Sequence, residues 1–293
     1  MSSIPTGAAG AQTARTSLPP AASAAIYTAA VMLLSAPFWV IVARAGIHGS
    51  MGVLGLMWCP AAAALLSALV TRRPIRAFGW RLPGFGYLAA AYVIPLVYAA
   101  AAYGAVWALG LGRIDTVHYQ SMLHRSVGSG LALIATLGVA IGCVSALGEE
   151  IGWRGFLVPV LAQRFGLTAT SLISGVIWAA WHVPVIIFGD YNGGTPAWYS
   201  VTCFAAAVLG ISFVMAWLRL ASGSLWPCML LHAAHNSFVQ DFFTPLTGDT
   251  GHTAWFIDEF GAFLPVAIIA AAVITLSRTG SRLRSPRQGS ATF

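Results

Sequence analysis

Long uncharged stretches constrain this chain more than any other feature of its sequence. Residues 24–43 and 131–147 are largely apolar and contain no Asp, Glu, Lys or Arg. A helix needs about 18 or more such residues to cross the hydrocarbon core of a bilayer. Charged residues make up only 8% of the chain, whereas a soluble domain has about 25%. The sequence therefore predicts an all-α fold, a polytopic membrane helix bundle.

About eight apolar stretches have the length, or nearly the length, of a spanning helix. In chain order they are 24–43, 53–70, 86–109, 131–164, 168–188, 198–218, 224–239 and 260–276. The fourth stretch is longer than a simple span, so we expect a bend or tilt near Gly148, Gly152 or Gly155. The polar segment 113–125 has the helical spacing of a piece that lies on the surface.

The two ends of the chain differ from the bundle, which we expect to be a single transmembrane domain over 23–278. Residues 1–22 are mostly Ser, Thr, Ala, Pro and Gly, a composition that predicts disorder. Residues 279–293 carry three arginines, and we expect them to form a basic cytoplasmic tail. The polar motifs described below all fall within 131–239.

The positive charge of the chain predicts its orientation. All 15 basic residues are Arg, and the net charge is +7. Cytoplasmic loops of membrane proteins are enriched in such residues. With eight helices, the basic loop 72–81, Arg164, Arg219 and the tail fall on one side, and the acidic loop 241–259 falls on the other. We therefore predict a multi-pass protein of the cell membrane with both termini cytoplasmic, and no nucleic-acid partner.

Three ionisable residues stand within six positions of the fourth apolar stretch: Glu149, Glu150 and Arg154. Each charge at membrane depth costs about 2.5–3.5 kcal/mol on insertion scales, so the presence of three such residues requires a functional or structural explanation. Glu150 and Arg154 are four positions apart and can pair on one helix face. Glu149 is rotated by about 100°, so we expect it to have no partner on its own helix. This pattern suits an acid/base site, although a structural ion pair with a spare glutamate would look the same.

Further polar residues occur at membrane depth in two later stretches. His182 lies in the fifth, and His232, His235 and Asn236 lie in the seventh. His232 and Asn236 are four apart and share a helix face, whereas His235 points elsewhere and is as compatible with a structural role as with a functional one. Polar groups of this kind avoid lipid, so we expect them to line one cavity with the charged residues of the fourth stretch.

This set of side chains favours attack of water on an amide. A carboxylate in apolar surroundings can take a proton from water, and His and Asn donors can stabilise an oxyanion. The pattern GxSxG is absent, and Cys59, Cys143, Cys203 and Cys228 form no CxxC pair. A zinc site made by Glu149, His182 and His232 is an alternative, because three protein ligands suffice for catalytic zinc. The HExxH pattern of many zinc peptidases is absent.

The ordered motifs resemble those of the CPBP family, which includes the type II CAAX prenyl endopeptidases and the bacteriocin-processing Abi proteins. The resemblance rests on Glu149-Glu150 with Arg154, on an aromatic residue four before His182, and on His232 with Asn236. Trp178 stands where the family usually has Phe. The resemblance implies that Glu149 activates water, that Glu150 and Arg154 brace it, and that His182, His232 and Asn236 position water and hold the oxyanion.

The family resemblance implies an intramembrane endopeptidase that needs no cofactor and cleaves a peptide or membrane-protein substrate in the bilayer. Two other classes stay open from the residues alone. A non-catalytic immunity or scaffold protein would keep the motifs as a packing network. An ion-coupled transporter would also place such groups at mid-depth, but it usually has inverted repeats, and here the polar groups concentrate in one half of the chain.

Overall fold

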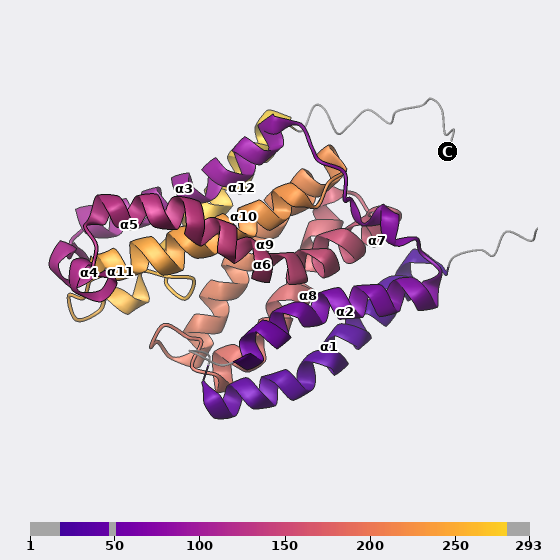
Figure 1. Cartoon of the computed structure of the whole chain (residues 1–293), viewed down its shortest axis with the longest axis horizontal. Helices are drawn as coiled ribbons and strands as arrows, with labels where there is room; N and C mark the ends of the chain where they lie inside the picture. The colour runs from indigo at the N-terminus through magenta and orange to yellow at the C-terminus, as the bar shows by residue number, and fades with distance from the viewer. Residues whose placement is uncertain (1–17, 47–50, 280–293) are drawn as a thin grey trace, which may run out of the picture.

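A computed structural model describes residues 18–46 and 51–279, and these ranges form a helix bundle (Figure 1). Within them, six helices are long and apolar enough to cross a membrane. They are α1 (Pro20–Ala45), α2 (Met51–Thr71), α3 (Phe85–Ala108), the composite helix Val127–Ala162, α8 (Leu167–Phe188) and α9 (Ala197–Ser222). Helices satisfy every backbone polar group internally, as hydrocarbon requires. The prediction of an all-α, multi-pass membrane bundle is confirmed.

The count of eight spanning helices is not confirmed. The predicted seventh helix consists of α10 (Trp226–Asn236), the π-helical η4 (Ser237–Phe243) and α11 (Thr244–Leu246). The predicted eighth is α12 (Phe263–Thr279), which has only 17 residues. Neither belongs to the six helices of spanning length and composition in the described ranges. The seventh is made more polar by the same histidines and asparagine that define its motif.

The fourth stretch is one continuous helical rod with two wider π-helical sections. Its parts are α5 (Val127–Leu133), the π-helical η2 (Ile134–Gly138), α6 (Val139–Glu150), the π-helical η3 (Ile151–Leu157) and α7 (Val158–Ala162). Gly152 and Gly155, where we expected a bend, both lie in η3. Such π-helical turns are rare and often mark functional sites. Here η3 starts directly after the two glutamates.

Glycine lets the rod approach the N-terminal helices closely. A Cβ atom at Gly152 would lie 2.4 Å from the hydroxyl oxygen of Tyr27 in α1 and 2.6 Å from the carbonyl oxygen of Pro60 in α2. Both distances are shorter than a carbon–oxygen contact allows, so a side chain at this position would force the helices apart. The glycine thereby fixes how α1 and α2 pack against the segment that carries the glutamates.

The central helices α6, α8, α9 and α10 lie between the α1–α2 pair, drawn in indigo and purple, and the group of α3, α4 and α5 (Figure 1). This arrangement brings the three predicted motifs together, because one lies at the end of α6, one in α8 and one in α10. The site is therefore formed in the middle of the bundle by segments far apart in the sequence.

The short segment between α3 and α5 contains the surface helix that we expected there. Helix α4 (Thr116–Leu123) begins at Asp115, whose side chain accepts a hydrogen bond from the backbone N–H of His118 at 2.9 Å. This bond holds the pKa of the Asp115 carboxyl below its usual value. The strand β1 (Arg113–Ile114) pairs antiparallel with β2 (Thr247–Gly248), a pairing that we did not predict.

The ends of the chain fall partly outside the described residues. Of the segment predicted to be disordered, 1–17 lies outside, whereas α1 already begins at Pro20, four residues earlier than expected. Proline is favoured at the first helical position because its missing N–H would be unpaired there anyway. The predicted basic tail, with Arg282, Arg284 and Arg287, lies outside the described ranges.

The basic loop between α2 and α3 lies at the same end of the bundle as the ends of α7 and α9. The Arg73 guanidinium donates to the side chain of Gln163 at 3.1 Å. Arg219 donates to the carbonyl of Ala77 at 3.0 Å, within the 3₁₀ helix η1 (Ile75–Phe78). The neighbourhood agrees with a topology in which this loop, Arg164 and Arg219 share one side. Which side faces the cytoplasm stays a prediction.

Candidate active site

Glu149 is buried at the end of α6, with 2% of its surface exposed. Its Oε2 atom accepts hydrogen bonds from two indole N–H groups, that of Trp178 at 2.9 Å and that of Trp153 at 3.2 Å. Trp153 is four residues further along the same helical rod, so our expectation that Glu149 has no partner on its own helix is wrong. An indole N–H is a hydrogen-bond donor, so a tryptophan four positions along a helix can pair with a carboxylate.

The other oxygen of Glu149 is available for chemistry. In the described part of the chain, Oε1 takes no hydrogen bond from a protein group, and it is not among the fully enclosed polar atoms. Glu149 also lines the central cavity. One carboxylate oxygen is therefore fixed by two neutral donors while the second faces the space where a ligand would lie.

Glu150 and Arg154 form the ion pair that their spacing predicts. Arg154 Nη1 lies 2.8 Å from Glu150 Oε1, and both side chains are at most 2% exposed. The same Oε1 atom lies 2.9 Å from Nδ1 of His232 in α10. Glu150 thus holds His232 directly and has no direct bond to Glu149. Its Oε2 atom is buried without a hydrogen-bond partner among the described residues.

Arg154 links the two glutamates through an aromatic ring. Its guanidinium carbon lies 4.1 Å above the centre of the Trp178 ring, a cation–π contact. The N–H of that same ring donates to Glu149. Arg154 therefore pairs with Glu150 by charge and contacts the ring that donates to Glu149, without a direct contact to Glu149.

The two motif histidines have different partners. Nδ1 of His182 donates to the carbonyl oxygen of Trp178 at 3.0 Å, because a carbonyl can only accept. The ring of His182 packs against Trp181 and Phe204, with centroids 4.7 and 4.8 Å away. In His232, Nδ1 faces a carboxylate instead. Each histidine therefore keeps Nε2 for another contact.

Four of the six predicted site residues line one cavity of about 240 Å³: Glu149, His182, His232 and Asn236. Glu150 and Arg154 do not line it and stand behind its wall. The rest of the wall is mostly apolar and includes Val53, Leu56, Val208, Ile211 and Ile268. Among the described residues that form this wall, none is Ser, Thr or Cys, so no hydroxyl or thiol of those residue types is placed to act as a nucleophile.

No cluster of side chains among the described residues matches the zinc alternative. In ranges 18–46 and 51–279, no three or more His, Cys, Asp or Glu side chains are grouped so that they could hold a metal ion. Glu149, His182 and His232 share the cavity but do not form such a group. Metal dependence is therefore a question for a chelation experiment.

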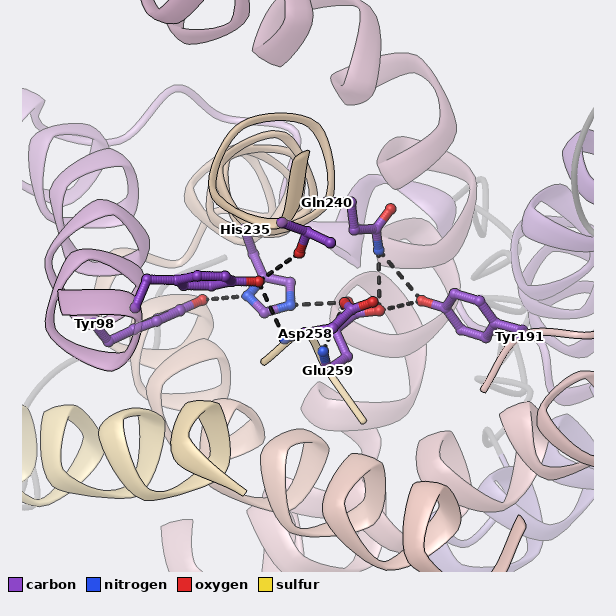
Figure 2. A network of polar contacts seen from close by, with 8 residues as sticks. Tyr98, Tyr191, His235, Gln240, Asp258 and Glu259 are labelled. Carbon is purple, nitrogen blue, oxygen red and sulfur yellow. Dashed lines mark hydrogen bonds and ion pairs between the residues drawn. The ribbon is translucent and has the colours of Figure 1, made fainter. Parts of the chain in front are cut away.

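His235, whose role the sequence left open, belongs to a second polar cluster in the same cavity. It lies between Tyr98 of α3 and Glu259, which stands in the loop before α12 (Figure 2). From the sequence, Glu259 is assigned only to the acidic loop 241–259, and no pattern marks its other partners, Tyr191 and Gln240, as site residues. They stand in loops or follow no recognised motif, so only the folded chain brings them to the cavity.

The fold and the site together define a class: multi-pass membrane helix bundles with a buried carboxylate, two histidines and an asparagine around an internal cavity. Comparison with known proteins then shows which family the segment that carries these residues resembles. Residues 131–238 match the family described as Type II CAAX prenyl endopeptidase Rce1-like, and this range contains all six predicted site residues.

One curated relative is also named as a CAAX prenyl protease. The chain is 29% identical over 83 residues to CAAX prenyl protease 2 of Methanococcus maripaludis. The aligned part is 26% of this chain and 30% of that protein. The chain thus matches about a third of the relative's length. The two matches confirm the resemblance to the CPBP, or CAAX protease, family over the part of the chain that carries the motifs.

Proposed function

We propose that the protein is an intramembrane endopeptidase, a hydrolase that cleaves a peptide bond of a membrane-associated protein or peptide. The observation that carries the proposal is the placement of Glu149. One of its oxygens is held by two indole N–H groups and the other faces a cavity lined by His182, His232 and Asn236. The family match and the name of the relative support the same class of reaction.

Glu149 is the general base in this proposal. Its Oε1 takes a proton from a water molecule while the water oxygen attacks the carbonyl carbon of the scissile bond. The carbonyl oxygen becomes an oxyanion. When the C–N bond breaks, the proton held by Glu149 passes to the leaving nitrogen, and the carboxylate is restored.

His232 and Asn236 are the proposed oxyanion donors. A carboxylate partner favours the protonated form of an imidazole, and Glu150 supplies one at 2.9 Å. A protonated His232 donates through Nδ1 to Glu150 and through Nε2 to the developing oxyanion. The Asn236 amide N–H is a second, neutral donor on the same helix face.

His182 has a different part in the proposal. Its Nδ1 proton is engaged by the carbonyl of Trp178, so the neutral ring offers Nε2 as an acceptor. An acceptor suits the attacking water, which donates one hydrogen bond to His182 and keeps that proton, while its other proton is transferred to Glu149. The family resemblance gives the two histidines one shared role. In our proposal their different partners make His182 the acceptor for water and His232 the donor to the oxyanion.

Glu150 and Arg154 are positioning residues in this scheme. They hold His232 and Trp178 and have no place in the cavity wall. Peptide or membrane-protein substrates in the bilayer are the proposed partners, and the cell membrane with both termini in the cytoplasm is the proposed location. The alternative from another class is a non-catalytic immunity or scaffold protein, in which the same contacts only stabilise the bundle.

The test is cleavage of a broad peptide pool by protein purified in detergent, followed by mass spectrometry. Wild type is compared with Glu149→Gln and with Asp190→Asn, a matched carboxyl-to-amide change at an exposed position. We expect Glu149→Gln to lose about 10²–10⁴-fold in rate and Asp190→Asn to keep the wild-type rate. Rapid cleavage by Glu149→Gln would overturn the assigned base.

Two further outcomes separate the alternatives. Loss of activity with a strong zinc chelator, restored by added Zn²⁺, would make Glu149, His182 and His232 metal ligands. Failure of folded wild type to cleave any peptide in the pool would favour the scaffold protein.

A further inference from the structure

A second polar cluster lies in the wall of the proposed catalytic cavity. Its members are drawn from separate parts of the chain: Tyr98 from α3, Tyr191 from the loop after α8, His235 from α10, Gln240 from η4 and Glu259 from the loop before α12 (Figure 2). All of them except Tyr98 line the cavity that also contains Glu149. The lining of the cavity therefore contains a second group of polar side chains besides the proposed catalytic residues.

Glu259 is the centre of this cluster. Its Oε1 lies 3.0 Å from Nε2 of His235. Its Oε2 accepts from the side-chain amide of Gln240 at 3.0 Å and from the hydroxyl of Tyr191. Oε1 has a single partner among the described residues, so it retains room for another donor.

The hydrogen-bond pattern makes the partners of Glu259 electrically neutral. The hydroxyl of Tyr98 lies 2.6 Å from Nδ1 of His235, and it has no other acceptor among the described residues. Its proton therefore goes to Nδ1, which leaves the His235 proton on Nε2, where it is donated to Glu259. With His235 neutral, and with Tyr191 and Gln240 uncharged, the carboxylate charge has no cation beside it.

Three hydrogen-bond donors favour the ionised form of Glu259 in spite of its burial. Burial acts to raise the pKa of its carboxyl, and the hydrogen bonds from His235, Tyr191 and Gln240 act to lower it. The side chain is 5% exposed. A charge held by neutral donors in a poorly hydrated site acts strongly on other charges.

The cavity as a whole carries excess negative charge. Its described lining contains Glu149 and Glu259 but no Arg or Lys. Behind the wall, Arg154 is matched by Glu150, so even a protonated His232 compensates only one of the two lining carboxylates. A cavity with such a field attracts positively charged groups and disfavours negative ones.

We propose that Glu259 forms a subsite for a cationic group of the substrate, either the side chain of a Lys or Arg or a free N-terminal ammonium. The proposal rests on the proposed peptidase function and adds a substrate class to it. The cation donates to Oε1 of Glu259 and holds the peptide with its scissile bond near Glu149. The peptidase thus selects substrates with a positive charge at a fixed distance from the bond that is cut.

A purely structural role makes a different prediction. If the cluster only fastens the loop before α12 to α3 and α10, its variants alter stability without changing the preference between charged and neutral substrates. The discriminating quantity is therefore a ratio of rates for two matched peptides, measured on the same protein preparation.

The experiment uses peptide pairs in which one Lys is moved along the sequence and is compared with norleucine at the same position. A second pair compares a free N-terminus with an acetylated one, which separates the two sources of the cation. We expect wild type to prefer the charged member about tenfold or more in kcat/KM at one position. In Glu259→Gln the ratio falls to about one. Tyr191→Phe, which removes a donor but keeps the charge, retains a preference.

Binding to the Glu149→Gln variant separates this inference from the proposed function. A peptide that binds more tightly with Lys than with norleucine, and loses that difference in Glu149→Gln/Glu259→Gln, supports the subsite even if no cleavage occurs. If Glu259→Gln does not fold, competition on wild type replaces it: hexylammonium is expected to displace the peptide, and hexanol is not. The proposal would be overturned by equal charged-to-neutral ratios of kcat/KM in wild type and Glu259→Gln. Equal displacement of the peptide by hexylammonium and by hexanol would also overturn it.

Discussion

The indole nitrogen of Trp178 lies 2.9 Å from Oε2 of Glu149, and the same ring lies under the guanidinium of Arg154. This relationship changes how the charged motif works. Arg154 does not contact the proposed base but polarises the ring that does. Trp178, which stands where the family usually has Phe, adds a hydrogen-bond donor that Phe lacks.

We expect Trp178→Phe to lower kcat/KM of the proposed reaction by about fivefold to tenfold. One hydrogen bond to a charged group contributes about 1.5–3 kcal/mol, and the remaining bond from Trp153 compensates part of it. Trp153→Phe is the matched variant, and the double variant is expected to lose more than either single one. Initial rates of cleavage of one peptide are measured for wild type, the two single variants and the double variant. An unchanged rate in the double variant would contradict a role for the indole donors.

The ion pair of Glu150 and Arg154 is expected to stabilise the fold in addition to positioning His232 and Trp178. Glu150→Gln or Arg154→Met leaves one buried charge without its partner, which costs about 3–5 kcal/mol. The double variant removes both charges, so we expect it to be more stable than either single variant. The unfolding temperatures of the variants in detergent give this order of stability. Single variants that unfold at the wild-type temperature would show that the pair is not a structural element.

Much of the fold follows from the sequence because hydrocarbon imposes one simple rule, that uncharged stretches become helices. The predicted third helix, 86–109, differs from α3 by one residue at each end. The prediction is weaker where polar residues enter a helix, as in α10 and η4, since a hydropathy pattern does not distinguish a spanning helix from one that ends inside the bundle. The pairing of Arg113 with Gly248 depends on tertiary contacts and has no local signal.

From the sequence, the contacts of the site can be predicted only between residues that lie on the same helix. The four-residue spacing predicts the bond between Glu150 and Arg154, and the same spacing, applied to Trp153, would have predicted its bond to Glu149. The bond between Glu150 and His232 joins residues 82 positions apart. The sequence pattern does not show which of the two adjacent glutamates binds His232, because this contact depends on how α10 packs on α6.

Gly152 offers a test of the close packing behind the glutamates. A Cβ atom there would lie 2.4 Å from Tyr27 Oη, so Gly152→Ala is expected to destabilise the protein by about 1–3 kcal/mol. Gly104→Ala in α3 is the control, because nothing lies within 4 Å of its added Cβ and Ala favours helix. The unfolding temperatures of both variants are compared with wild type. Equal temperatures for the two would contradict the packing argument.

The loop before α12 is expected to make stability depend on pH through Asp258. Burial and the neighbouring Glu259 raise the pKa of the Asp258 carboxyl from 3.8 to about 7. Between these values the folded protein binds a proton that the unfolded chain has lost. Stability therefore decreases as the pH rises from about 4 to 7, and the change levels off above that range.

The variant Asp258→Asn isolates this effect from all other titrating groups. Asn tolerates the left-handed backbone of this position, where φ is +67°, and it cannot ionise. We expect the unfolding temperature of Asp258→Asn, relative to wild type, to rise as the pH increases from 5 to 8. The two proteins are scanned side by side in one detergent at several pH values. A constant difference across this range would mean that Asp258 titrates near its ordinary pKa and that the loop carries its charge at no cost.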